Sequence, residues 1–350
     1  MAKKTQSVGI AFPQVQFVEG GAEVHAASLY SALQKRGFHV SRINIPFSFS
    51  PPRQIVRDCL AWRLLDVSRS YVREVDILIA TKFPSYVARH PKKVVYLWHQ
   101  HREAYELFGS EYCQLTKSEE DLGIRDALVE LDNRCLREAK AVFSQSKTVA
   151  ARLKKYNGID SKVIYPPPRH ANIFKCEGYE DFFFCPGRLE KNKRVDFILD
   201  AFSHTKANVK CVVTGKGPQE DDLKKSVRRD KRLRDRVEFM GWVDEKTLVD
   251  LYSRCLGVLF APKDEDLGFV TLDAFLSKKP VLTTDSSGAV LEFVHDGETG
   301  LVAKTDPKAY AECMDRLAQD RKLAKRLGEA GYEIATALNW DYVVDHLMSF

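Results

Sequence analysis

Residues Gly257–Pro280 have the sequence GVLFAPKDEDLGFVTLDAFLSKKP. The apolar run Gly257–Ala261 predicts a buried strand. Three acidic residues and a glycine follow, and then Phe269–Leu276 has the apolar spacing of a helix. An acidic loop and a helix N-terminus at the carboxyl end of a strand are typical of a ligand site in an open α/β sheet. Glu265 and Asp273 lie eight residues apart, so both can face one bound molecule.

Strands and helices alternate on both sides of this stretch. Apolar segments of the first half predict strands at 8–12, 39–45, 76–80, 94–98, 141–144 and 163–165. Those of the second half predict strands at 182–185, 209–214, 237–240, 257–261 and 281–284. Helical patterns occupy most of the intervals between them. This repeated βαβ alternation predicts an α/β protein with two Rossmann-like, doubly wound parallel sheets.

Three consecutive prolines divide the chain, because proline continues neither a helix nor a central strand. We predict an N-terminal domain at 1–168, a linker at 169–181 and a C-terminal domain at 182–337. A last helix at 338–350 is expected to pack back towards the N-terminal domain. Ligands bind at the carboxyl ends of the strands in such sheets, so we expect the two domains to face each other across a ligand-binding cleft.

Composition narrows the class of protein. No apolar run approaches the roughly 20 residues of a membrane-spanning helix, and we expect no signal peptide. Eight cysteines without a CxxC pair favour free thiols and a cytoplasmic location. Residues 1–168 carry 25 Lys and Arg against 17 Asp and Glu, a net charge of +8, and the remainder carries 29 against 31, a net charge of -2.

The basic first half favours either a phosphate-bearing acceptor or peripheral association with an anionic membrane, such as the inner face of the cell membrane. A merely solvated basic surface is the alternative. The basic residues are spread out rather than clustered, so we predict no nucleic-acid site.

A glycine pair, Gly20-Gly21, precedes the first predicted helix. Glycine lets a ligand approach the backbone, and a helix N-terminus offers N–H groups to a phosphate. Many strand–helix turns carry glycine only because the chain turns there, so both interpretations stay open at this point.

Six short motifs follow one another along the chain. They are GGAE at 20–23, GRL with a lysine four residues later at 187–193, GKGP at 215–218, FMGWV at 239–243, the acidic pair at 265–273, and GETGLV at 297–302. In this order they resemble the retaining glycosyltransferases of the GT-B fold known as glycosyltransferase family 4, or group 1. The resemblance extends from Val8 to about Leu347.

The resemblance implies roles for the charged residues. The first acid of the family's E-x7-E motif, here Glu265, lies against the donor sugar, and the second, here Asp273, binds the ribose. Asp273 is one methylene shorter than the family's glutamate, which is expected to shift donor affinity. Arg188 and Lys193 would neutralise the leaving diphosphate without a metal ion, since fixed cations stabilise developing negative charge. A solvated helix start is the alternative for both cations.

The family also has a histidine after the strand at 94–98, close to the donor sugar. His99 is our first choice and His101 the second, with a capping or core histidine as the alternative for either. Arg102, Tyr105 and Glu106 could line the acceptor side, and Ser146 is given a supporting role. The resemblance places the remaining donor-binding positions at Gly20, Gly21, Gly215, Gly241, Leu267, Gly268 and Phe269.

These roles imply transfer of a hexose, with mannose as the first choice, from a GDP- or UDP-sugar to the hydroxyl of a saccharide, lipid-linked or other acceptor. The anomeric configuration would be retained, and neither a metal nor a cofactor is expected. One alternative is a non-catalytic nucleotide-sugar-binding subunit, suggested by Asp273. A sugar-nucleotide epimerase or a phosphorylase on the same fold is another, although a phosphorylase would need a pyridoxal phosphate lysine and a longer chain.

Overall fold

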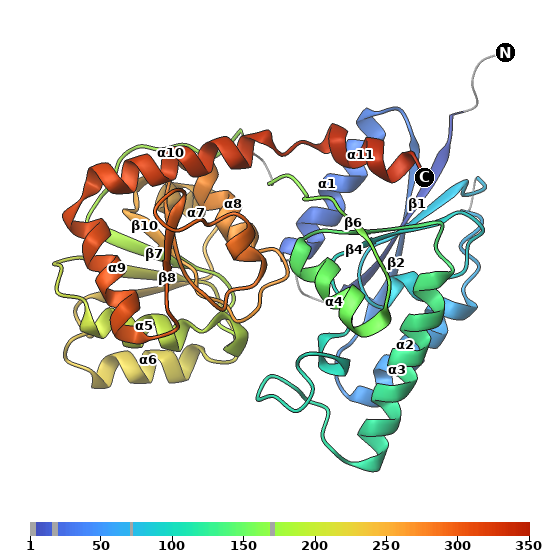
Figure 1. Ribbon diagram of the computed structural model, residues 1–350, viewed down its shortest axis with the longest axis horizontal. Coiled ribbons are helices and arrows are strands. Elements are labelled where there is room, and N and C mark those ends of the chain that lie inside the picture. The colour runs from blue at the N-terminus through green and yellow to red at the C-terminus, as the bar shows by residue number, and fades with distance from the viewer. Residues whose placement is uncertain (1–4, 16–19, 71–72, 169–171) are drawn as a thin grey trace. The chain divides into compact units, whose positions relative to one another are not determined.

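The computed structural model describes residues 5–15, 20–70, 73–168 and 172–350 (Figure 1). The first three residues of the predicted linker therefore lie outside the described residues. The chain forms two compact units: the first comprises Met1–Pro166 together with Asn339–Phe350, and the second comprises Pro167–Leu338. Each unit holds one six-stranded sheet, and every described strand pairing is parallel. The predicted fold class of two Rossmann-like parallel sheets is confirmed.

The sheet of the first unit has the strand order β2-β1-β3-β4-β5-β6. Its strands are β1 (Ser7–Val15), β2 (His39–Phe47), β3 (Ile77–Ala80), β4 (Lys93–Leu97), β5 (Ala141–Ser144) and β6 (Lys162–Val163). The central strands β3 and β4 are buried along their whole length, as expected for strands covered on both faces. β2 lies at the edge of the sheet, and exposed residues recur along most of it.

Five α-helices are described in the first unit. They are α1 (Gly21–Lys35), α2 (Pro52–Leu64), α3 (Glu119–Arg137), α4 (Lys147–Asn157) and α11 (Trp340–Met348). The C-terminal helix α11 packs on α1: Arg36 pairs with Asp341 at 3.1 Å and with Asp345 at 2.5 Å. The buried ring of His25 lies 5.7 Å from the ring of Trp340. Burial lowers the pKa of His25 to about 3, so the imidazole is neutral in this aromatic contact.

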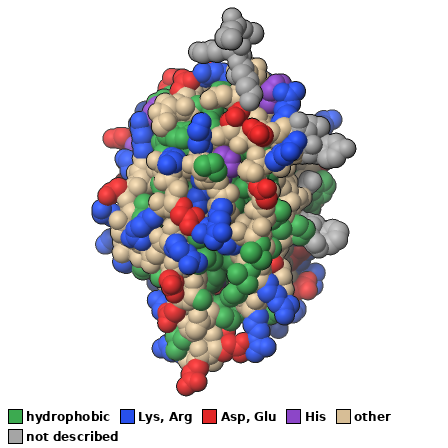
Figure 2. All heavy atoms as spheres, turned by 90° about the vertical axis from the view of Figure 1, so that its right-hand side faces the viewer, with side chains coloured by type: hydrophobic (Ala, Val, Ile, Leu, Met, Phe, Trp, Pro, Cys, Tyr) green, Lys and Arg blue, Asp and Glu red, His purple; other side chains and the backbone are tan. Residues whose placement is uncertain are grey.

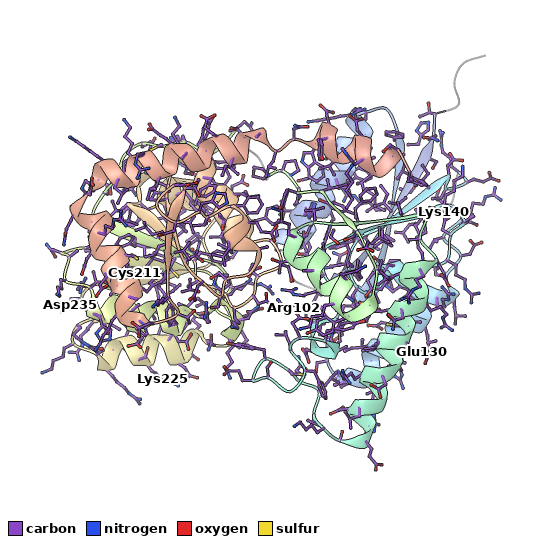
Figure 3. The ribbon with its side chains drawn as sticks, viewed as in Figure 1. Arg102, Glu130, Lys140, Cys211, Lys225 and Asp235 are labelled. Atoms are coloured by element: carbon purple, nitrogen blue, oxygen red, sulfur yellow. The ribbon has the colours of Figure 1, made fainter. Side chains whose placement is uncertain are left out.

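The sheet of the second unit has the strand order β12-β11-β10-β7-β8-β9. Its strands are β7 (Phe182–Pro186), β8 (Lys210–Thr214), β9 (Val237–Gly241), β10 (Gly257–Leu259), β11 (Val281–Thr284) and β12 (Gly300–Ala303). Its helices are α5 (Val195–His204), α6 (Glu220–Arg229), α7 (Glu245–Arg254), α8 (Phe269–Leu276), α9 (Pro307–Gln319) and α10 (Arg321–Ala337). Cys211, labelled in Figure 3, is one of the fully buried residues of the core between the sheet and α5, α6 and α9.

Within the parts of the chain that the structure describes, no helix is both long enough and apolar enough to cross a membrane.

Candidate functional site

The loops at the carboxyl ends of β7, β8 and β9 are joined by backbone hydrogen bonds. Gly187 N donates to Thr214 O at 3.2 Å, and Gly215 N donates to Gly241 O at 2.6 Å. Leu189 N also donates to Lys216 O at 3.0 Å. Three of the predicted motifs therefore meet along one edge of the sheet, which leaves their backbones close to any ligand bound there.

Gly215 is a position that only glycine can occupy. Its φ is +108°, and a Cβ atom there would lie 1.9 Å from the carbonyl oxygen of Gly187. Gly241 also has a positive φ, of +66°. The close approach of a neighbouring loop thus requires glycine at position 215, whereas at position 241 only the positive φ favours it. A role of either glycine in donor binding stays a prediction.

Two of the predicted catalytic residues contact each other. Lys193 Nζ donates to Glu265 Oε2 at 2.6 Å, and the two side chains are only 15% and 17% exposed. Lys193 ends a short 3-10 helix, Lys191–Lys193, that follows β7. Residues 72 positions apart are thereby brought together at the carboxyl edge of the sheet, where β7 and β10 are neighbours.

The backbone of Glu265 is fixed by the loop that follows β11. Glu265 N donates to Ser287 O at 3.2 Å, and Glu265 O accepts from Ala289 N at 2.9 Å. Between them Gly288 lies so close that a Cβ atom would stand 2.6 Å from Glu265 N. The carboxylate therefore projects from a rigid support, although it belongs to a loop.

Arg194 is a residue of this region that sequence reasoning missed. It is 9% exposed, and its φ of +51° is unusual for a residue other than glycine. Its guanidinium connects the loops after β10 and β11 by donating to Ala261 O at 2.7 Å, Pro262 O at 3.0 Å, Thr284 Oγ1 at 2.6 Å and Ser286 Oγ at 3.1 Å. Its only sequence signal was a third basic residue after Lys191 and Lys193.

The other predicted donor-binding residues of the second unit differ in exposure. Arg188 is 58% exposed and pairs with Glu190 at 2.7 Å. Gly268, with a φ of +84°, is the N-cap of α8, and Leu267 before it is buried. Asp273 lies within α8 and is only 4% exposed, and its contact with the ribose stays a prediction.

In the first unit, the predicted phosphate-binding turn is closed by its own acid. Gly20 N donates to Glu23 Oε2 at 2.9 Å, which caps the N-terminus of α1. Glu23 in turn lies 3.6 Å from Lys82, whose side chain is 6% exposed. Gly21 is the first residue of α1. A phosphate would have to compete with the Glu23 carboxylate for the Gly20 amide, so the role of this turn in donor binding remains a prediction.

The two candidate histidines lie in different surroundings. His101 is 3% exposed, with its ring centroid 6.1 Å from that of Phe49 and 5.3 Å from that of Phe83. Burial, followed by the neighbouring His99, lowers the pKa of His101 to about 4. His99 is half-buried, and its Nδ1 lies 2.9 Å from Gln100 O. His101 has the surroundings of a core residue, which leaves His99 as the better candidate.

The expectation that Tyr105 lines the acceptor side is corrected by the structure. Tyr105 is 6% exposed, and its hydroxyl donates to Asp132 Oδ2 at 2.7 Å. Tyr86 donates to the other oxygen of this fully buried carboxylate at 2.9 Å, and Asn157 Nδ2 donates to the Tyr105 hydroxyl at 3.2 Å. A phenol inside a core needs a polar partner, and α3 supplies it.

Asp132 makes the stability of the first unit depend on pH. Burial raises its pKa to about 7, against the lowering effect of the two tyrosine hydroxyls, whereas an exposed aspartate has a value of about 3.9. The folded state therefore favours the protonated form, and this stabilisation is lost as the pH rises from about 4 to about 7. We expect the unfolding free energy of the native protein, minus that of Asp132→Asn, to fall over this interval and then level off.

Urea unfolding of both proteins at a series of pH values measures this difference. Because asparagine does not titrate, all other pH effects cancel in the comparison. A difference that stays constant between pH 4 and pH 8 would contradict the raised pKa.

Arg102 and Glu106 form a charged cluster with an arginine of α4. Glu106 Oε1 accepts from Arg102 Nε at 2.5 Å and lies 3.5 Å from Arg152 Nε, and all three side chains are at most 15% exposed. Arg102, labelled in Figure 3, is the first residue of the short 3-10 helix Arg102–Ala104. Two guanidinium groups thus contact one carboxylate.

Ser146 has a structural role in the first unit. It is the N-cap of α4, and its Oγ accepts from Val149 N at 3.1 Å.

The residues that the structure describes contain no group of three or more His, Cys, Asp and Glu side chains able to hold a metal ion.

A protein-family model described as "Glycosyl transferases group 1" matches residues 170–334. The second unit is a group 1 glycosyl transferase domain. The predicted relationship is thereby confirmed for the half of the chain that carries Lys193 and Glu265.

Individual proteins give the same result. The chain is 27% identical over 192 residues to an uncharacterized glycosyltransferase of Methanocaldococcus jannaschii. The aligned region covers 54% of this chain and 50% of that protein. It is 28% identical over 169 residues to the alpha-1,3/1,6-mannosyltransferase ALG2 of Dictyostelium discoideum, and this aligned region covers 43% of this chain and 40% of ALG2. The matches thus span about half or less of these curated relatives.

A solved structure resembles the whole chain. Sucrose-phosphate synthase of Thermosynechococcus elongatus superimposes with a TM-score of 0.78 at 18% identity, covering 98% of this chain and 97% of that one. This likeness, together with the two parallel sheets, confirms the GT-B fold class for a chain that contains a group 1 glycosyl transferase domain.

Proposed function

We propose that this protein is a retaining glycosyltransferase that moves a hexose from a nucleoside diphosphate sugar to an acceptor hydroxyl without a metal ion. The observation that carries the proposal is the 2.6 Å contact between Lys193 and Glu265 at the carboxyl edge of a group 1 glycosyl transferase domain. A fixed cation beside a carboxylate, both largely shielded from water, suits a reaction in which a diphosphate leaves from a sugar.

In this mechanism Lys193 stabilises the negative charge that develops on the leaving phosphate. In the structure the ammonium group is neutralised by Glu265, and on donor binding the diphosphate would share that charge. Glu265 would then accept hydrogen bonds from the hydroxyls of the transferred sugar. Arg188, which is 58% exposed and pairs with Glu190, would bind phosphate oxygens with two parallel hydrogen bonds.

The number of carboxylates near the sugar supports the proposal that the anomeric configuration is retained. A glycosidase that retains configuration uses two carboxyl groups about 5–5.5 Å apart across the scissile bond. The sequence offers Glu265 as the one acid for the sugar, so the leaving phosphate itself would take the proton of the acceptor hydroxyl. Transfer then occurs on the face from which the diphosphate departs. The ribose role of Asp273 and the sugar contact of His99 remain predictions.

Mannose is the proposed sugar, and an anionic or lipid-linked saccharide is the proposed acceptor. The similarity to ALG2, described as a mannosyltransferase, supports the first, and the net charge of +8 in residues 1–168 supports the second. All eight cysteines are free thiols, which supports a reducing location such as the cytoplasm.

One observation favours a second candidate, a non-catalytic nucleotide-sugar-binding subunit. Asp273 stands where the family has glutamate, and it is 4% exposed. A shorter side chain at a buried position would reach less far towards a bound donor. Such a subunit would bind donors without turning them over.

The test is incubation of the purified protein with GDP-mannose, UDP-glucose and UDP-N-acetylglucosamine, followed by measurement of released nucleoside diphosphate and of binding by calorimetry. We expect binding and slow hydrolysis of GDP-mannose, both reduced in Glu265→Gln. Binding without any turnover, even with lipid-linked acceptors present, would favour the non-catalytic subunit. A folded sample that binds none of the donors would overturn the proposal.

A further inference from the structure

Trp242 is the one tryptophan in the sequence of the second unit. It directly follows β9 and is 72% exposed. Tryptophan is highly buried on average, and Trp62 and Trp98 of the first unit are at most 2% exposed. A tryptophan that leaves so much of its indole in water therefore needs an explanation.

Exposed hydrophobic side chains do not by themselves indicate a ligand. Figure 2 shows hydrophobic side chains between Lys, Arg, Asp and Glu on the face of the first unit that carries α2 and α3. Leu64, the last residue of α2, is 82% exposed, and isolated residues of this kind are normal on protein surfaces. Trp242 differs because it stands at the carboxyl edge of a parallel sheet, where ligands bind in open α/β folds.

Glycines line this edge between Arg188 and Trp242. Gly187 follows β7 and Gly241 ends β9, and a Cβ atom at either position would meet no atom of another described segment within 4 Å. Gly215 lies between them, close to Gly187 O and hydrogen-bonded through its N–H to Gly241 O. The edge therefore presents backbone without side chains, with open space beside Gly187 and Gly241.

The strand order sets the distance along this edge. β7, β8 and β9 are neighbours in that order. Adjacent strands lie about 4.8 Å apart, so the ends of β7 and β9 are separated by roughly 10 Å. The ribose and base of a nucleotide extend over a similar distance from the diphosphate. A nucleotide with its diphosphate at Arg188 would therefore reach Trp242 with its base.

We propose that the indole of Trp242 stacks on the base of the donor nucleotide and favours a purine, so that the donor is a purine nucleoside diphosphate sugar. This inference rests on the proposed function and names the class of donor. Aromatic side chains stack on the π-face of a base. The fused rings of guanine cover more of an indole than the single ring of uracil does, and more apolar area then leaves water.

A protein partner is a weaker explanation for the exposed indole. β9 is the edge strand of its sheet, and Met240 is the other exposed large hydrophobic residue on it, at 38%. Glu238 of the same strand is exposed and charged. Two apolar side chains fall well short of the roughly 20–30 residues that each side of a standard protein interface contributes.

The experiment is calorimetric titration of the full chain with GDP and with UDP. We expect the native protein to bind GDP more tightly than UDP. Trp242→Ala should weaken GDP binding at least about fivefold and UDP binding less. Trp242→Phe keeps an aromatic ring and should retain most of the affinity for GDP. Tyr342→Ala, which removes an exposed ring from the first unit, is the matched control and should bind GDP like the native protein.

Tryptophan fluorescence gives a second readout that a merely structural role would not change. GDP stacked on Trp242 should quench the emission of the native protein, because Trp62 and Trp98 are buried in the first unit. The quenching should disappear in Trp242→Phe, although this variant still binds GDP. Circular dichroism and the thermal transition verify that each variant is folded.

The outcomes separate this inference from the proposed function. Equal affinity of the native protein and Trp242→Ala for GDP overturns the inference and leaves the proposed function intact. Tighter binding of UDP than of GDP by the native protein, or undiminished quenching in Trp242→Phe, also overturns the inference alone. A folded native protein that binds neither nucleotide overturns both.

Discussion

Replacing Lys193 by alanine is expected to lower the turnover of sugar transfer by a factor of about 10²–10³, the usual effect of removing one fixed group that stabilises a developing negative charge. Lys193 is a strong candidate because its ammonium group is 2.6 Å from the Glu265 carboxylate and its side chain is 15% exposed. Without it, the leaving diphosphate would face Glu265 with no cation between them. The loss should therefore appear mainly in kcat, measured as release of nucleoside diphosphate with donor and acceptor in excess.

The control is Lys225→Ala, which removes the same charge from an exposed position of α6 in the same unit (Figure 3). It should leave kcat within about a factor of two, because the contribution of exposed charges is small. A Lys193→Ala protein that keeps full turnover while folded would show that the pair with Glu265 is only structural.

Replacing Lys93 by methionine is expected to lower the unfolding free energy of the first unit by roughly 3–5 kcal/mol. The side chain of Lys93 is fully buried at the start of β4, and burial lowers its pKa. Its Nζ donates to the carbonyl oxygens of Tyr86 at 2.8 Å, Ala88 at 3.0 Å and Cys135 at 2.9 Å, and it lies 3.3 Å from Glu138.

Methionine fills the volume of the lysine stem but leaves three buried carbonyl groups without this donor. Glu138 would keep its contact with Arg63 at 2.5 Å, so the cost comes mainly from the carbonyls. Scanning calorimetry should show the transition of the first unit at a lower temperature. The neighbouring Lys92 is exposed, and Lys92→Met should leave the transition within about a degree or two. Equal behaviour of the two variants would mean that the buried hydrogen bonds of Lys93 are not needed for stability.

Sequence patterns predicted the fold because its elements depend on local spacing. The apolar runs around Ile77–Ala80 and Gly257–Leu259 are short and uninterrupted, as strands covered on both faces must be, and both were predicted within one or two residues. The order of strands in each sheet was not predictable in the same way. In the second sheet β10 pairs with β7 and not with β9, the strand that precedes it in the chain. Packing of the crossover helices decides which strands become neighbours.

For the candidate site, the sequence determined which side chains with suitable chemistry stand at the carboxyl ends of strands: Lys193 after β7, Glu265 after β10 and His99 after β4. Only the tertiary structure decided what each one contacts. It joined Lys193 to Glu265 across 72 residues, placed the Tyr105 hydroxyl on the buried Asp132, and brought two carbonyl and two hydroxyl oxygens to the guanidinium of Arg194. The physical reason is that a strand or helix follows from periodicity along the chain, whereas hydrogen bonds and ion pairs depend on distances between segments that the chain order does not set.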